Sequence, residues 1–206
     1  GLRGFAVLSV LLFHFFPNLL PSGYLGVDVF FVLSGFLIAL VLSKSSPTDA
    51  MSYLTFYFKR SRRILPLYLL VGLLRPITSE TLKSGELIFY NTKSAIAALL
   101  FTTNLEEKDE GEDYFLKLRQ GENYFTHTWS LAVEMQFYTV APFLVFAGKL
   151  LGQRRSYLGL GFSVFVIASS LAHFLSLSPS DAFNSTLARL WQFTFGIVAF
   201  QLEASI

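Results

Sequence analysis

Apolar runs close to the length of a membrane span constrain the fold of this chain more than any other feature. A transmembrane helix needs about 20 predominantly apolar residues. Hydrophobic residues make up 53% of the sequence and charged residues only 15%, against about 45–50% and about 25% in soluble domains. The sequence therefore predicts an all-α, polytopic transmembrane bundle in an integral, multi-pass membrane protein. The candidate spans are residues 5–20, 23–42, 64–77, 86–103, 127–148, 156–177 and 183–202.

Lysine and arginine residues predict the orientation of these spans. Lys44 and the cluster 59–63 follow the second span, and Lys149, Arg154 and Arg155 follow the fifth, so both loops are expected on the cytoplasmic side. An even number of crossings must separate two cytoplasmic loops, whereas three candidate spans lie between these two. We therefore expect residues 86–103 to form a partial or re-entrant helix, which leaves about six crossings in one domain covering residues 1–206.

Two ionisable residues lie inside the first apolar runs. His14 belongs to the run 5–20 and Asp28 to the run 23–42. An ionisable group at membrane depth is costly, about 2.5–3.5 kcal/mol for Asp on insertion scales, and marks a functional site by default. A short turn joins the two runs into an expected antiparallel hairpin, and counting outward from that turn at about 1.5 Å per residue puts both groups at nearly one depth. We expect Asp28 to contact and orient His14.

Other polar residues in the spans have both structural and functional interpretations. His127, Ser130 and Glu134 recur at spacings of three and four on one expected helix face. The sequence disfavours a serine nucleophile there, because no nucleophile elbow surrounds Ser130, and it favours Glu134 as a buried proton-handling or structural acid. Arg189 stands near the start of the last run, where it either reaches the interface or contacts substrate.

Arg60 and Arg63 also have two interpretations. They lie three residues apart and so share a helix face. They either hold phosphate groups with their guanidinium forks or simply anchor the cytoplasmic end of a span. The chain has no cysteine and a net charge of only +2, so we expect no disulfide, no thiol nucleophile, no metal site and no nucleic-acid partner. The small residues Gly26, Ser34 and Gly35 favour close helix packing.

Several sequence blocks, in order along the chain, resemble the acyltransferase-3 family of integral-membrane O-acyltransferases. The blocks are Gly1-Leu-Arg-Gly-Phe-Ala-Val-Leu with His14, Gly26-Val-Asp-Val-Phe-Phe-Val-Leu-Ser-Gly-Phe-Leu, Arg60-Ser-Arg-Arg-Ile-Leu-Pro, His127-Thr-Trp-Ser-Leu-Ala-Val-Glu-Met-Gln-Phe-Tyr and Ala188-Arg-Leu-Trp-Gln-Phe-Thr-Phe-Gly. Family members usually have about ten spans, so we expect this chain to be incomplete at its C-terminus. Met135 stands where a second acid often follows the equivalent of Glu134.

The resemblance implies transfer of an acyl group from cytoplasmic acyl-coenzyme A, a co-substrate rather than a bound cofactor, to a hydroxyl of a glycan or lipid-like acceptor. The family histidine corresponds to His14, and its arginines to Arg3, Arg60 and Arg63. Arg3 and His14 lie about 16 Å apart on one helix face, along which the pantetheine arm could run. His14 would act either as general base or as an acyl-histidine relay. A proton-coupled transporter and a catalytically silent scaffold or receptor remain alternatives.

Overall fold

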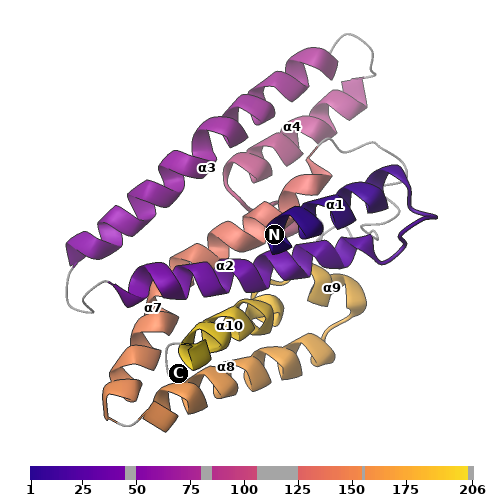
Figure 1. Ribbon diagram of the computed structural model, residues 1–206. Coiled ribbons are helices and arrows are strands. Elements are labelled where there is room, and N and C mark those ends of the chain that lie inside the picture. Colours follow the sequence, from indigo (N-terminus) through magenta and orange to yellow (C-terminus); the bar gives the residue numbers. More distant parts are fainter. Residues whose placement is uncertain (45–49, 80–84, 106–124, 155, 204–206) are drawn as a thin grey trace. The chain divides into compact units, whose positions relative to one another are not determined.

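The computed structural model describes residues 1–44, 50–79, 85–105, 125–154 and 156–203, and every regular element in these ranges is helical (Figure 1). This confirms the all-α fold class for the part described. Most of the segment 104–126, which carries seven acidic residues and is expected to be a solvated loop, lies outside the described residues, and so does Arg155. The elements are α1 (Leu2–Phe15), η1 (Gly23–Leu25), α2 (Gly26–Ser43), α3 (Ala50–Ser79), α4 (Gly85–Leu99), η3 (Thr126–Thr128), α7 (Trp129–Arg154), α8 (Ser156–Ser176), α9 (Pro179–Asn184) and α10 (Thr186–Glu203).

Three helical segments are long and apolar enough to cross a membrane: Gly23–Ser43, Trp129–Gly152 and Tyr157–Ser176. α4 has 15 residues, a length of about 22 Å against the roughly 30 Å of a bilayer core. A helix of this length is too short to cross upright, and the partial or re-entrant character of residues 86–103 stays a prediction. The total of six crossings stays a prediction.

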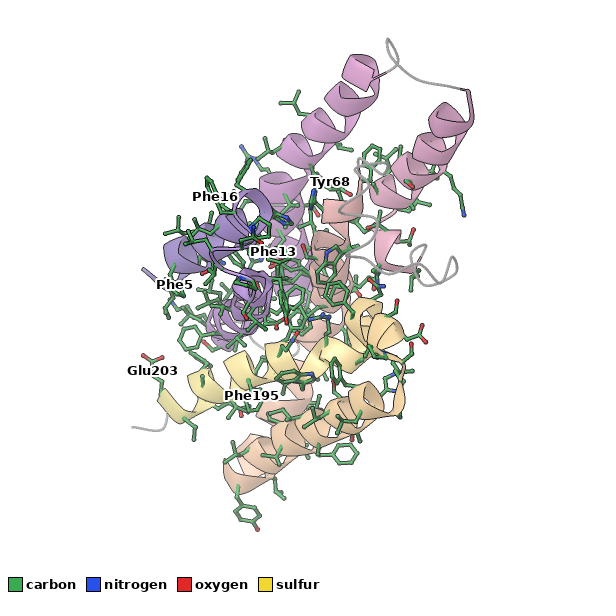
Figure 2. The ribbon with its side chains drawn as sticks, turned by 90° about the vertical axis from the view of Figure 1, so that its right-hand side faces the viewer. Phe5, Phe13, Phe16, Tyr68, Phe195 and Glu203 are labelled. Atoms are coloured by element: carbon green, nitrogen blue, oxygen red, sulfur yellow. The ribbon has the colours of Figure 1, made fainter. Side chains whose placement is uncertain are left out.

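The chain divides into two compact units. Unit 1 comprises Gly1–Pro47, Tyr138–Ser176 and Leu187–Ile206, and unit 2 comprises Thr48–Phe137 and Leu177–Thr186. Large apolar side chains of unit 1 project outward from its helices, among them Phe5, Phe16 and Phe195 (Figure 2). Such exposure is typical of a lipid-facing surface rather than of a water-facing one.

In unit 1, α2 lies between α1 and α10 (Figure 1). A Cβ atom added to Gly26 would lie 2.6 Å from the carbonyl oxygen of Ala6 in α1, and one added to Gly23 would overlap the carbonyl oxygen of Ser9. Glycine at these positions therefore permits the backbones of the hairpin to approach closely. The close packing predicted from Gly26 is confirmed.

A second pair of glycines joins α2 to α10. A Cβ atom on Gly35 would overlap the carbonyl oxygen of Phe193, and one on Gly196 would overlap the carbonyl oxygen of Val32. The rings of Phe31 and Phe193 stack beside this contact, with their centroids 4.7 Å apart. The two helices run in the same direction, because residues later in α2 contact residues later in α10.

The C-terminal end of α2 is capped by a lysine of α7. Lys149 Nζ donates hydrogen bonds to the carbonyl oxygens of Leu42 at 3.1 Å and Ser43 at 2.9 Å. These are among the terminal carbonyls that a helix leaves without internal partners. The cap brings Lys149 to the end of α2 that carries Lys44, so these two of the basic residues predicted to be cytoplasmic lie at the same end of unit 1.

Candidate functional site

His14 lies in the last turn of α1 and is half-buried. The helix ends there because Pro17 disfavours helical backbone at the preceding residue, and Phe16 departs from it with φ −138° and ψ 63°. The imidazole lies beside the ring of Phe13, with the centroids 5.3 Å apart, and Figure 2 labels that phenylalanine. The histidine is thus held near the turn of the hairpin rather than at its centre.

The register of the hairpin contradicts the expected contact between His14 and Asp28. Gly26 packs between Ala6 and Val10 of α1. From this level His14 lies about 9 Å toward the turn of the hairpin, and Asp28 lies about 3 Å away from the turn. The two residues are therefore about 12 Å apart along the helix axis. Asp28 also follows Gly26 by two residues, which is about 200° round the helix. It therefore lies on the face of α2 that is turned away from α1. The prediction of equal depth was wrong because it counted the whole run 5–20 as helix.

Asp28 instead pairs with Arg189 of α10. The Arg189 Nη1 atom donates to Asp28 Oδ1 at 2.9 Å, with the arginine side chain 6% exposed and the aspartate side chain 32% exposed. The same Nη1 atom donates to Gln192 Oε1 at 3.3 Å, and the guanidinium carbon lies 5.8 Å from the centre of the Phe31 ring. Two charges within apolar helices thus neutralise each other.

This ion pair argues against one of the two interpretations that the sequence left open for Arg189, a side chain that reaches the interface, while contact with substrate stays a prediction. A side chain that reaches the interface would be exposed, whereas Arg189 as a residue is 5% exposed. From Asp28 to the C-terminal end of α2 at Ser43 the helix rises about 22 Å, so the pair lies well away from the end capped by Lys149. Sequence reasoning missed it because the partners are 161 residues apart.

A cluster of amide side chains in unit 2 was also missed. Asn104 and Gln136 exchange hydrogen bonds of 3.3 Å and 2.9 Å. Asn104 also donates to the carbonyl oxygen of Asn184 at 2.9 Å, Gln136 donates to that of Phe101 at 2.8 Å, and Thr186 donates to Gln136 Oε1. Within the described part of the chain, the buried Oδ1 atom of Asn184 has no hydrogen-bond partner.

This cluster satisfies irregular backbone that follows α4. Phe101 has a left-handed backbone with φ 55°, and its ring stacks on Tyr68 of α3 with the centroids 4.9 Å apart. Non-helical backbone at membrane depth is tolerated only where protein groups satisfy it. The cluster therefore supplies a hydrogen-bond donor to the carbonyl oxygen of Phe101, where the chain leaves α4 after 15 residues.

The expected polar face of α7 is present only in part. His127 is exposed in the short helix η3, while Ser130 and Glu134 are half-buried in α7. The change of helix type between them alters the regular spacing on which the shared face was predicted. The role of Glu134 as an acid of the site stays a prediction.

The three arginines proposed from the sequence for donor binding lie within helices rather than in loops. Arg60 is half-buried and Arg63 is exposed, both within the continuous 30-residue helix α3. Arg3 is exposed in the first turn of α1, and the helix is unbroken from there to His14. The predicted common face of Arg3 and His14 is thus compatible with the helix that forms.

The comparison with protein families assigns the chain to a family. A model of an acyltransferase domain matches residues 1–206. The chain belongs to the acyltransferase-3 family. Its members are multi-pass membrane proteins, and the three long apolar helices agree with this. No solved structure matches the chain.

Curated relatives of the chain carry names of O-acetyltransferases. It is 32% identical to O-acetyltransferase OatA of Staphylococcus aureus over 207 residues, which cover 96% of this chain and 33% of that protein. It is 31% identical to the putative peptidoglycan O-acetyltransferase YrhL of Bacillus subtilis over 202 residues, with 95% and 31% covered. The chain thus spans about a third of the length of these relatives.

Proposed function

We propose that this chain is the membrane part of an O-acyltransferase that moves an acyl group, most simply acetyl, from acyl-coenzyme A to a hydroxyl of a glycan or lipid-like acceptor. The observation that carries the proposal is the full-length match to the acyltransferase family, together with relatives named O-acetyltransferases. The name of the Bacillus relative, a putative peptidoglycan O-acetyltransferase, supports a glycan acceptor. The proposal also includes six crossings of the membrane, with the C-terminal end of α2 that Lys149 caps on the cytoplasmic side.

The proposed chemistry centres on His14. Its imidazole takes the proton of the acceptor hydroxyl while the oxygen attacks the thioester carbonyl, the carbon–sulfur bond breaks, and the proton passes to the leaving thiolate. This role suits a group whose unperturbed pKa lies near neutrality. In the relay version, an imidazole nitrogen attacks the thioester carbonyl, the carbon–sulfur bond breaks and coenzyme A leaves as its thiol with the imidazole proton. The hydroxyl oxygen then attacks the acyl group, the carbon–nitrogen bond breaks and the imidazole recovers the hydroxyl proton. Glu134 is proposed as a second proton-handling group.

Donor binding is assigned to arginines on the cytoplasmic side. Arg60 and Arg63 would hold the phosphates of acyl-coenzyme A, because guanidinium forks match phosphate oxygens. Arg3 would assist at the start of α1, with the pantetheine arm directed along that helix toward His14. No resident cofactor or metal is needed for this chemistry.

The test is to incubate membranes containing the full-length protein with labelled acetyl-coenzyme A and to follow the label into acceptor. His14→Ala should lower the transfer rate by about 100-fold or more, as loss of a general base does, with normal membrane insertion. His173→Ala is the matched control, because His173 is an exposed histidine of α8 with no assigned role. A His14→Ala protein that keeps half of the wild-type rate would contradict the catalytic assignment.

A further inference from the structure

A stripe of aromatic and basic side chains runs along the first half of α3. Tyr53, Tyr57 and Arg60 are all half-buried. Their spacings of four and three residues place them within about 60° of one another round the helix, and Arg63 follows about 60° to one side. The other two basic residues of the cluster, Lys59 and Arg62, fall outside this sector.

The ring of Tyr57 packs against the ring of a buried neighbour. Phe56 is 5% exposed and meets Tyr57 nearly edge to face, with the centroids 5.3 Å apart and the ring planes at 67°. Contact with a buried neighbour limits the orientations that the Tyr57 ring can adopt. A supported ring beside a cation is an arrangement on which a planar base can stack at low entropic cost.

The order of the groups along α3 matches the order of groups in a coenzyme A donor. Arg60 and Arg63 immediately precede the apolar run that begins at Ile64, so phosphates held there leave the pantetheine arm on the membrane side. Tyr57 lies one turn before Arg60, about 4.5 Å along the axis, and Tyr53 about 10 Å before it. The side away from the membrane is where the adenosine end of the donor would lie.

We propose that Tyr57, flanked by Tyr53, forms the adenine-binding surface of the donor site. This rests on the proposed acyl-coenzyme A donor and extends it from the phosphates to the base. The tyrosine ring stacks on the adenine while the neighbouring arginines hold the phosphates. The protein would then recognise both the adenine and the phosphates of the donor.

The test compares two ligands in competition with labelled acetyl-coenzyme A on the full-length protein in membranes. The ligands are coenzyme A and 4′-phosphopantetheine, which lacks the adenosine 3′,5′-bisphosphate part and keeps one phosphate. Tyr57→Leu should weaken coenzyme A at least about fivefold, the lower limit for loss of one base stack, and should leave 4′-phosphopantetheine unchanged. Tyr57→Phe should keep the wild-type ratio of coenzyme A affinity to 4′-phosphopantetheine affinity, since it keeps the aromatic ring. Tyr53→Leu should also lower the ratio of coenzyme A affinity to 4′-phosphopantetheine affinity.

Phe58→Leu is the matched control, because Phe58 is the adjacent aromatic residue, is 65% exposed and lies about 100° round the helix from Tyr57. It should change neither affinity. If Tyr57→Leu binds both ligands as the wild type does, or loses both equally, adenine stacking is overturned while the proposed donor stands. If the wild-type protein binds neither ligand, the proposed donor itself is overturned.

Discussion

The ion pair between Asp28 and Arg189 yields a quantitative prediction about stability. Asp28→Leu would leave the guanidinium of Arg189 buried without its carboxylate, with only 6% of that side chain exposed. Removing one partner of a buried pair costs about 3–5 kcal/mol. Arg189→Met should fall toward the lower limit, because the Asp28 side chain is 32% exposed and thus less buried than the Arg189 side chain. The double variant should be more stable than either single one, because an apolar replacement of both charges is often neutral.

The assay is reversible unfolding of the purified full-length protein in detergent, followed as a double-mutant cycle. With a near-neutral double variant, the coupling energy between Asp28 and Arg189 should approach the sum of the two single costs, about 6–8 kcal/mol. The same cycle between Asp28 and His14 should be additive within about 0.5 kcal/mol. If His14→Ala restores the stability lost in Asp28→Leu and Arg189→Met does not, the ion-pair assignment is refuted. The contact between Asp28 and His14 that the sequence predicts would then be favoured.

Two further predictions concern helix packing and donor binding. Gly35→Ala should destabilise the protein by about 1–3 kcal/mol or more, because the new methyl group meets the backbone of α10, whereas Gly161→Ala, with nothing within 4 Å, should stabilise it by up to about 1 kcal/mol in the same unfolding assay. Replacing Arg60 and Arg63 together by lysine should weaken coenzyme A binding in the competition assay, because a point charge does not reproduce a bidentate fork. Arg62→Lys should leave that binding unchanged, and equal effects from both changes would favour a plain cytoplasmic anchor.

The positions of the helices could be predicted from the sequence because long apolar runs leave few alternatives in a membrane. The runs 23–42 and 156–177 agree closely with α2 and α8. The helix before the first turn could not be bounded in the same way, because apolar content does not distinguish helix from turn between Phe16 and Ser22. In that segment proline geometry overrides hydropathy.

The partners of the polar residues were harder to predict than the residues themselves. Asp28 was recognised as costly inside an apolar run and Arg189 was noted near the start of another, but a sequence does not say which of several spans lie side by side. Asn104 and Gln136 carried no signal at all, since amides are uncharged and the two lie 32 residues apart. Only the arrangement of helices identifies such pairs, and the catalytic roles of His14 and Glu134 stay predictions.

The glycines between α2 and α10 also restrict motion. Sliding one helix along the other by a single turn would bring Phe31 or Ala39 to the position of Gly35, and either Cβ atom would meet the Phe193 carbonyl oxygen that Gly35 avoids. A one-turn slide of α2 along α10 is therefore blocked at this contact. The register that pairs Asp28 with Arg189 is thus fixed by two glycines that touch neither charge.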